Sequence, residues 1–489
     1  MKRNSTKYAA AAIFVLGLTL SASAWAQWSS DANQNLALSD IAGADQVQPK
    51  LAPLPDSSWY VSWFNANPND PPPNGYDTYL QRLDPNGIEQ FQHDGVQVAK
   101  LTNSSTEDYG LDTDAQGNAL LAFLDTRENP NQQITAAKMA PNGQPLWGPL
   151  GVQLTHGGSN LHSPKIAATS DGGVVVAWTS GSNLVLEKLN ANGRPVWPGA
   201  SVRNPGLVLG ETGYNYMLSD LHASDNGSVI VSFSRDHGFR TNRFLYANKI
   251  SATGALLWGT GHVKVWDGGS LQLGNYPSFI PDGSGGAVFA WYSSNPSLQV
   301  FVQHVLANGT EAFAHNGVAV STNGANVRVD PAASYRPSTQ EIFVFWEEED
   351  ALQSVSGVYG QKLNATGARQ WGDTGLQIVP LGNNAEIFEK TVQIGDGAFA
   401  FWVDQQVTQN GTIQGIRLDN AGNTVCAQFP VSSVDSPKSR PWAAIAPSGL
   451  TAVAFQDSRS GNSDIYIQNI NPDCSLGIES RHPGKGLRR

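Results

Sequence analysis

The chain has 489 residues, of which 40% are hydrophobic and 15% charged, and this balance is typical of a globular protein and excludes an intrinsically disordered one. Acidic residues outnumber basic ones by 41 to 30, so we expect no nucleic-acid partner, because a nucleic-acid-binding surface needs an excess of positive charge. The 50 glycines favour an all-β protein with many tight turns.

The first 26 residues have the pattern of a secretory signal peptide. Basic residues precede an apolar run from Ala9 to Leu20, and Ala24-Trp25-Ala26 is the small-x-small pattern that signal peptidase accepts. The run is shorter than the roughly 20 apolar residues that a spanning helix needs. We therefore expect cleavage after Ala26 and a mature chain in the periplasm or outside the cell, with no membrane span.

After the signal peptide, one pattern recurs eight times. A turn glycine followed four residues later by an aromatic, as in Gly367 and Trp371, is one landmark of the repeat. Each unit holds four short apolar runs separated by Gly, Asn, Asp and Pro, which predicts four strands. Four-stranded sheets repeated in this way predict an all-β, eight-bladed β-propeller. A second landmark, at intervals of 53 to 60 residues, is the aromatic that ends an apolar run: Trp63, Phe123, Trp178, Phe233, Trp291, Trp346, Trp402 and Phe455.

The two ends of the chain hold complementary parts of one unit. Residues 28–47 match the end of a repeat without its beginning, whereas the last repeat stops near Gly477 without its final strand. We therefore predict that the N-terminal strand completes the last blade and closes the ring, since an open solenoid would need capping repeats. A seven-bladed ring with one divergent unit is the alternative, because the first and fourth copies are longer. The expected domains are the signal peptide 1–26, a single propeller domain over 27–480 and a basic tail, 481–489, that we expect to be disordered.

The only two cysteines, Cys426 and Cys474, stand at departures from the repeat. Cys426 replaces the landmark aromatic of the seventh unit, and Cys474 falls near the turn glycine of the eighth. In an exported chain this predicts a disulfide between the last two blades. Two unpaired buried thiols are the alternative.

The residue two positions after each landmark aromatic would lie in a circle on one face of a closed ring. One interpretation is a polar rim that binds a ligand, or the carboxylates of a glycan-cleaving enzyme. The other is local structure, in which Asp125 pairs with Arg127 and Asp457 with Arg459. The catalytic candidates of the first interpretation are Glu348 and Asp404, with Asp125 or Asp457. The landmark aromatics themselves are expected to fill the core rather than to bind sugar.

The loops between successive units hold the residues that do not repeat. The loop 206–222 is long and rich in tyrosine, and His156 lies in an earlier one. Loops on a rigid scaffold often carry function, and aromatic and polar side chains there can stack on a sugar and hydrogen-bond to it. The ligand-binding candidates, for which simple packing is the alternative, are Tyr214, Tyr216, His222, His162 and Tyr276.

Two stretches define the repeat most clearly. Phe455 to Arg459 is followed by Tyr466-Ile467-Gln468, and Trp346 is followed by Tyr359-Gly360-Gln361 and by Gly367 to Trp371. This pattern of Trp-x-Asp-x-Arg, Tyr-x-Gln and Gly-x-x-x-Trp resembles exported bacterial β-propeller proteins that are mostly of unassigned function. The resemblance runs from end to end of the repeats and implies the fold and export, while its motifs specify the blade and no activity.

The sequence favours a binding or interaction module whose carbohydrate or protein ligand docks on the loop face. The alternative is a glycoside hydrolase or lyase with carboxylates at the central mouth. Stretches such as Thr169 to Gly173 look like degraded Asp boxes of sialidases, but Asp-Gly is ordinary hairpin chemistry. No metalloprotease, nucleophile-elbow or phosphate-loop motif is present. We expect a monomer that uses no cofactor and no metal.

Overall fold

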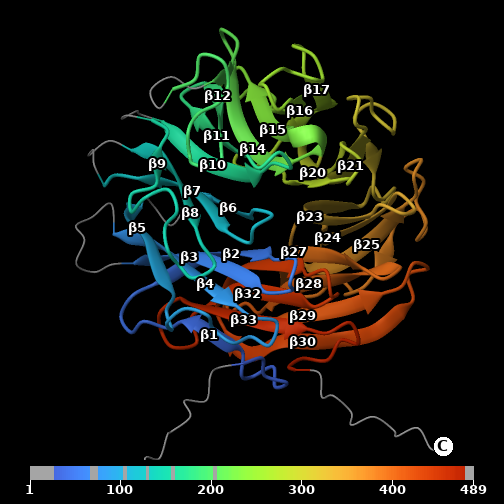
Figure 1. The fold of residues 1–489 in the computed structure, drawn as a ribbon. Coiled ribbons are helices and arrows are strands. Elements are labelled where there is room, and N and C mark those ends of the chain that lie inside the picture. Colours follow the sequence, from blue (N-terminus) through green and yellow to red (C-terminus); the bar gives the residue numbers. More distant parts are fainter. Residues whose placement is uncertain are drawn as a thin grey trace, which may run out of the picture.

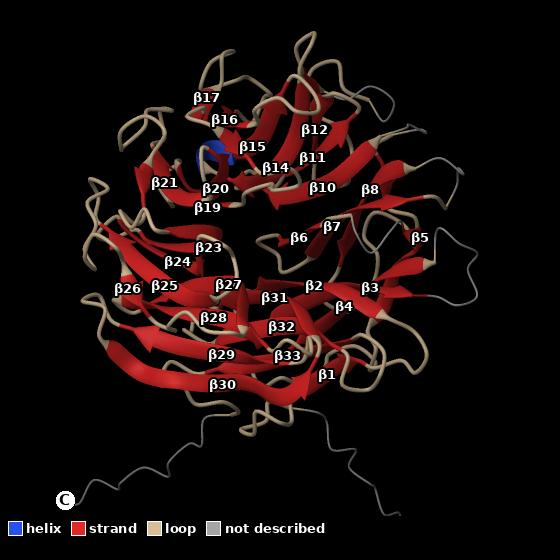
Figure 2. Cartoon of the chain, turned by 180° about the vertical axis from the view of Figure 1, so that it is seen from behind, coloured by secondary structure: helices blue, strands red, loops and turns tan. Residues whose placement is uncertain are grey.

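A computed structural model shows an all-β ring of eight blades, and the only helix among the described residues is the short 3-10 helix η1 (Asp225–Gly227) (Figures 1 and 2). The predicted signal peptide, 1–26, and the tail, 481–489, lie outside the described residues. Within the described residues, no helix is long and apolar enough to cross a membrane. The structure describes residues 27–66, 75–102, 107–127, 132–155, 160–201 and 206–478.

In each blade, antiparallel strands follow one another from the centre of the ring outwards. Blade one consists of β2 (Gln46–Pro53), β3 (Trp59–Ala66), β4 (Tyr76–Leu83) and β5 (Val96–Thr102). Blade two consists of β6 (Gly110–Thr113), β7 (Ala119–Asp125), β8 (Gln133–Met139) and β9 (Val152–Gln153). Blade three consists of β10 (Leu161–Ala168), β11 (Val174–Ser180), β12 (Asn183–Leu189) and β13 (Leu207–Leu209). Blade four consists of β14 (Asn215–Ala223), β15 (Val229–Asp236), β16 (Phe244–Ile250) and β17 (Val263–Trp266).

The other half of the ring repeats this order with small variations. Blade five has two short inner strands, β18 (Ser270–Leu271) and β19 (Phe279–Pro281), followed by β20 (Ala287–Asn295), β21 (Gln299–Val305) and β22 (Val318–Ala319). Blade six consists of β23 (Asn326–Arg336), β24 (Glu341–Asp350), β25 (Ser356–Leu363) and β26 (Leu376–Gln377). Blade seven consists of β27 (Ala385–Ile394), β28 (Gly397–Gln405), β29 (Gly411–Leu418) and β30 (Thr424–Ser436). Blade eight consists of β31 (Lys438–Ile445), β32 (Thr451–Asp457), β33 (Asp464–Ile470) and β1 (Leu36–Ser39).

The N-terminal strand closes the ring, as the sequence predicted. β1 is the outermost strand of blade eight and pairs antiparallel with β33, with Leu36 opposite Ile467 (Figure 1). The inner strands also form a closed series of contacts, from β2 through β6, β10, β14, β19, β23 and β27 to β31, which returns to β2. The ring therefore has eight blades rather than seven, and its inner strands surround a central opening.

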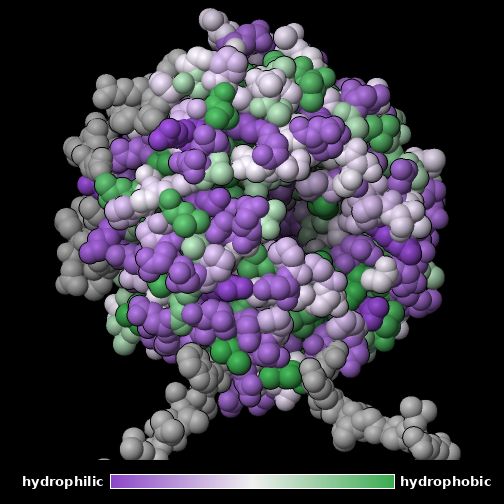
Figure 3. Space-filling view, viewed as in Figure 1, coloured by the Kyte–Doolittle hydropathy of each residue, from purple (hydrophilic) through white to green (hydrophobic). Residues whose placement is uncertain are grey.

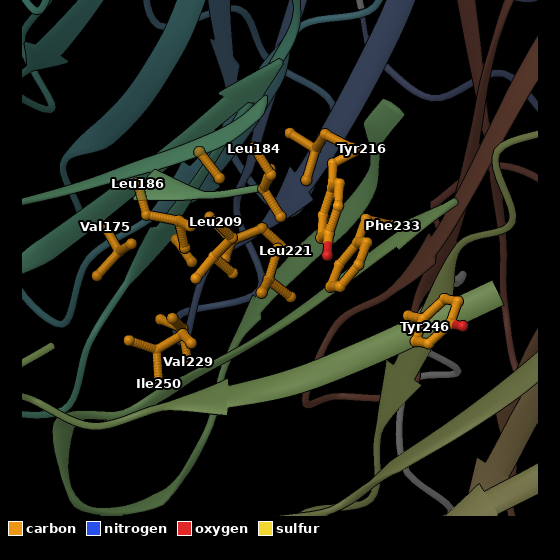
Figure 4. Close-up of a cluster of buried hydrophobic side chains, with 14 of the residues drawn as sticks. Val175, Leu184, Leu186, Leu209, Tyr216, Leu221, Val229, Phe233, Tyr246 and Ile250 are labelled. Atoms are coloured by element: carbon orange, nitrogen blue, oxygen red, sulfur yellow. The ribbon is translucent and has the colours of Figure 1, made fainter. Parts of the chain in front are cut away.

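The landmark aromatics lie on the second strand of each blade, and all eight are fully buried. This confirms their predicted role in the core. Figure 4 shows one cluster between blades three and four, where Leu184 and Leu186 meet Tyr216 and Phe233. Each of the eight hydrophobic clusters combines side chains of two neighbouring blades, so the core lies at the interfaces between blades. A large apolar side chain contributes about 1.5–3 kcal/mol to stability when it is fully buried.

The predicted disulfide is also present. Cys426 on β30 of blade seven is bonded to Cys474, which follows β33 of blade eight, with 6.4 Å between their Cα atoms. It joins the two blades next to the place where the ring closes, and the alternative of two free thiols is excluded.

Candidate functional site

A bulge interrupts the inner strand of several blades at equivalent places. The pairing register shifts there in β2, β10, β14, β23, β27 and β31. A bulge turns its side chains out of the ladder, and these strands surround the central opening, so their side chains reach it. Non-glycine residues with positive φ are strained and are held by the surrounding structure, often at functional sites. In five bulges such a residue occurs, with φ between 46° and 60°: Gln48, Ser163, Asp330, Phe388 and Arg440.

Charged side chains from blades one, two and three meet at one side of the opening. Nζ of Lys50 lies 2.7 Å from Oδ1 of Asp108, and Nζ of Lys165 donates to Oδ2 of the same carboxylate. Nζ of Lys50 also lies 4.3 Å from the ring centre of Trp442 on blade eight. Burial opposes the charge of Asp108, but Lys165 and Lys50 hold the pKa of this carboxyl well below its usual range. The carboxylate is nonetheless 43% exposed, which places this charged cluster in contact with solvent.

Blade four continues this cluster with Asp220 and His222 of β14. Nε2 of His222 lies 3.1 Å from Oδ2 of Asp220, and the backbone N–H of Phe279 donates to the same oxygen. Burial opposes protonation, but the Asp220 carboxylate raises the pKa of His222. His162 has a comparable partner, since its Nδ1 lies 3.1 Å from Oε1 of Glu107. Both histidines are therefore held by carboxylates, and His156 lies outside the described residues.

A pocket of about 310 Å³ opens between blades five, six and seven. Its lining includes Tyr276, one of the ligand-binding candidates, whose side chain is 41% exposed, together with Tyr292, Asp330, Phe388 and Glu389. Asp330 stands in the bulge of β23, and Phe388 and Glu389 stand in the bulge of β27. The pocket therefore belongs to the central opening. Figure 3 shows the surface hollowed near the centre of the ring. Aromatic rings and hydrogen-bonding groups thus converge on one concave site.

Glu389 is the most unusual residue of this pocket. It is 3% exposed, and neither of its carboxyl oxygens hydrogen-bonds to a described residue. Nζ of the adjacent Lys390 donates to the backbone carbonyl oxygen of Glu389, at 2.9 Å, rather than to its carboxyl group. Burial and the carboxyl group of Glu347 raise the pKa of Glu389 well above its usual range. A buried polar group without a partner destabilises a fold, so this one requires an explanation.

The structure places the catalytic candidates on four different blades. Oε1 of Glu348 accepts a hydrogen bond from Arg328 at 2.9 Å, and both side chains are buried. Oδ1 of Asp404 accepts one from Asn384 at 2.7 Å. Two further candidates are buried in ion pairs inside their own blades, Asp125 with Arg127 and Asp457 with Arg459 and Lys438. Each of the four carboxylates thus interacts with partners in its own surroundings, and the four do not come together in one site.

The tyrosine candidates lie in three different surroundings. Tyr214 lines a second pocket, of about 500 Å³, on the loop between blades three and four, where the Arg235 guanidinium lies 3.6 Å from its ring centre. Tyr216 is 2% exposed and stacks on Phe233, with 5.1 Å between ring centres, so it is part of the core. Tyr276 alone lines the pocket at the central opening.

Among the described residues, one group of three side chains is close enough to share a metal ion: Asp40, His93 and Asp94. His93 bridges Asp40 of blade eight and Glu89 of blade one, at 3.1 and 3.2 Å. The same bridge recurs between blades four and five, where His315 lies 3.0 Å from Asp267 and 2.9 Å from Glu311, and there asparagine replaces the third acid. Because the arrangement recurs, we interpret both groups as structural contacts in which a histidine links carboxylates of two neighbouring blades.

Comparison with known proteins assigns no family. No family model matches the chain, and no curated protein matches it. The polysaccharide lyase Uly1 is similar in structure, with 10% sequence identity and a TM-score of 0.43 over 88% of this chain and 91% of that one. A protein of unknown function from Dyadobacter fermentans has 8% sequence identity and a TM-score of 0.39, over 91% of this chain and 98% of that one. Prolyl oligopeptidase B from Galerina marginata has 11% sequence identity and a TM-score of 0.43, over 85% of this chain and 56% of that one. Similarities this weak assign no activity.

Proposed function

We propose that this protein is an exported propeller that binds a carbohydrate in the pocket at the central opening. The carboxyl group of Glu389 carries the proposal, because it is buried against this pocket and no described residue hydrogen-bonds to it. A sugar offers hydroxyl groups that would satisfy both oxygens. The rings of Tyr276, Tyr292 and Phe388 line the same pocket and offer faces on which the apolar side of a sugar ring can pack.

Size and surface character favour a small polar ligand over a protein partner. A volume of about 310 Å³ lies at the lower end of the range of small-molecule sites. Lys50, Asp108 and Trp442 on the other side of the opening add further polar and aromatic groups with which a longer glycan could make contact.

Export is part of the proposal. The sequence predicts a signal peptide over 1–26, and the Cys426–Cys474 disulfide supports the same location because disulfides persist in oxidising compartments. The mature chain, 27–489, would thus meet glycans in the periplasm or outside the cell.

A glycan array probed with the mature chain tests the proposal, with Tyr276→Ala and Tyr214→Ala as a pair of loop-tyrosine variants, one for each pocket. We expect wild type to bind a defined set of glycans, Tyr276→Ala to bind them about ten-fold more weakly, and Tyr214→Ala to bind them like wild type. Loss of binding in Tyr214→Ala alone would move the site to the other pocket. No binding to any glycan would contradict the proposal.

The same array tests the glycan-cleaving alternative. Two carboxyl groups, those of Glu389 and Asp330, line the pocket, and a pair of carboxyl groups is the usual equipment of glycoside hydrolysis. Bound glycans are therefore incubated with the protein and analysed for products. Cleavage that Asp330→Asn abolishes, with binding retained, would replace the binding role with an enzymatic one.

A further inference from the structure

We infer that the carbohydrate bound in this pocket carries a free, positively charged amino group, so that the ligand is an amino sugar whose ammonium pairs with Glu389. The inference rests on the proposed function and names the class of its ligand. Four observations carry it: the unpartnered carboxyl group, the excess of acidic groups around it, the aromatic lining, and the contrast with equivalent positions in other blades.

Acidic groups dominate the surroundings of Glu389. The carboxyl groups of Glu347 on β24 and Asp330 on β23 lie close enough to Glu389 to raise its pKa by charge repulsion. The ammonium group of Lys390 lies beside them and acts in the opposite direction. Lys390 directs its Nζ to a backbone carbonyl. The two cations of β23 have partners of their own: Arg328 is held by Glu348 and Arg336 by Glu341. Three carboxyl groups therefore face one ammonium group, which leaves room for the positive charge of a ligand.

Equivalent positions show that this excess of acid is specific to one interface. Glu389 stands in its bulge immediately before pairing with β28 resumes at Lys390. In blade two the corresponding residue is Tyr109, whose ring packs on Phe64 of blade one with 4.5 Å between ring centres. In blade four the corresponding residue is Ser219, and in four other blades it is proline: Pro49, Pro164, Pro331 and Pro441. A carboxyl group at this position is thus no requirement of the fold.

The aromatic lining suits an ammonium group as well as a sugar. A cation within about 6 Å of an aromatic ring centre is attracted to the ring face, and the attraction increases where water is excluded. Tyr276, Tyr292 and Phe388 line the pocket beside Glu389. Carboxylate and ring faces together can therefore hold an amine, while a metal ion would need several oxygen ligands at once. In the part of the chain that the structure describes, the one cluster of three possible metal ligands lies elsewhere, at His93.

Binding of an ammonium group would release a proton. Burial and Glu347 raise the pKa of the Glu389 carboxyl group, which favours its protonated form as long as no ammonium group is bound. Asp330 of β23 acts in the same direction, whereas Lys390 opposes it. An ammonium ion in contact with Glu389 favours the carboxylate, so the carboxyl proton leaves to solvent as the ion pair forms. A neutral sugar would release no proton.

Isothermal titration calorimetry, at a pH low enough to keep the amino groups of the probe protonated, tests the inference with three probes: fully deacetylated chitosan tetrasaccharide, its N-acetylated form, and cellotetraose. Two buffers of different ionisation enthalpy measure the proton release. We expect the deacetylated probe to bind at least about ten-fold more tightly than the other two, with net release of a proton from the protein. Glu389→Gln should lose both the preference and the proton release.

The control is Glu187→Gln. Glu187 is another buried glutamate, on β12 of blade three, and burial raises its pKa to about 7. We expect Glu187→Gln to bind like wild type, and thermal unfolding verifies that both variants are folded. Equal affinity for all three probes would overturn the inference and leave carbohydrate binding intact. Failure to bind any of the three would also overturn it, while the glycan array decides separately on the proposed function. Calcium binding that Glu389→Gln abolishes would show a metal site instead and overturn it too.

Discussion

Glu389 and Glu347 lie between blades six and seven in the place that Tyr109 and Phe64 occupy between blades one and two. Tyr109 fills that place with a packed ring, and its hydroxyl oxygen lies 2.9 Å from the backbone oxygens of both Gln48 and Ser62. The two glutamates bring carboxyl groups into the same kind of interface, where burial disfavours their charged forms. Two glutamates with raised pKa values thus lie together where most of the fold is packed with apolar side chains, and one of them, Glu389, lines the pocket. Departures of this kind from local packing rules are expected at functional sites.

The first prediction follows from the pKa of Glu347, which burial together with Glu349 and Asp330 raises from 4.5 to about 8. Below the lower value both the folded and the unfolded state are protonated. As pH rises toward the higher value, the unfolded state ionises more readily, so the free energy of unfolding falls. Glu347→Gln should abolish this loss and be about 2 kcal/mol more stable than wild type at about pH 8, with little difference at about pH 4. Urea denaturation at both pH values measures the difference, and a difference independent of pH would contradict the assignment.

The second prediction concerns the disulfide. The bond between Cys426 and Cys474 closes a loop with a sequence separation of 48 residues, for which loop-closure entropy gives about 4 kcal/mol of stabilisation. A double Cys426→Ser and Cys474→Ser variant should unfold at a lower temperature than wild type. Dithiothreitol should lower the unfolding temperature of wild type toward that of the variant and leave the variant unchanged. If dithiothreitol also lowered the unfolding temperature of the variant, the loss of the disulfide would not explain its effect on wild type.

The third prediction concerns ring closure by β1. Leu38 is fully buried in a cluster with Trp63 and Ile467, so it ties blade eight to blade one. Leu38→Ala should lower the free energy of unfolding by about 3 kcal/mol, since it removes buried methyl groups and leaves a cavity. Gln34→Ala, at an exposed position just before β1, is the control and should have no effect. Equal stability of the two variants in urea denaturation would mean that β1 contributes little to closure.

The fourth prediction separates structural carboxylates from functional ones. Asp457 is fully buried, and its Oδ2 lies 3.1 Å from Nζ of Lys438, which is equally buried. Asp457→Ala should lower the free energy of unfolding by about 3–5 kcal/mol, because it leaves the charges of Lys438 and Arg459 without their shared carboxylate. Adding Lys438→Met should restore part of that loss, and glycan binding should survive in the double variant. Loss of binding in a stable double variant would return Asp457 to the list of functional residues.

The repeat made the fold predictable. The landmark aromatics, from Trp63 to Phe455, are core positions on equivalent strands, so their spacing counts the blades directly. The complementary ends of the chain likewise predicted the closure by β1, and the two irregular cysteines predicted the disulfide. These features are visible because each depends on a residue type at a fixed position within one unit.

The site was less predictable because it depends on side chains from different units. Tyr276 was recognised as a loop aromatic, whereas Glu389 and Asp330 were not singled out, because they stand in bulges of inner strands. A signal was present in the recurring prolines of these bulges, at Pro49, Pro164, Pro331 and Pro441, where Glu389 takes the place of proline. The proximity of Glu389 to Glu347 follows from the packing of two blades, which sequence spacing does not report.

A bulky side chain can fill the pocket at the central opening without removing any group proposed to bind the ligand. Ser278 lines the pocket at the central opening, and Thr212 lines the other pocket, and both side chains are exposed. Glycan binding is measured for Ser278→Trp and for Thr212→Trp beside wild type, with thermal unfolding as the check on folding. We expect Ser278→Trp to lose binding and Thr212→Trp to retain it. Full binding by a folded Ser278→Trp variant would contradict the claim that the ligand occupies the pocket beside Glu389.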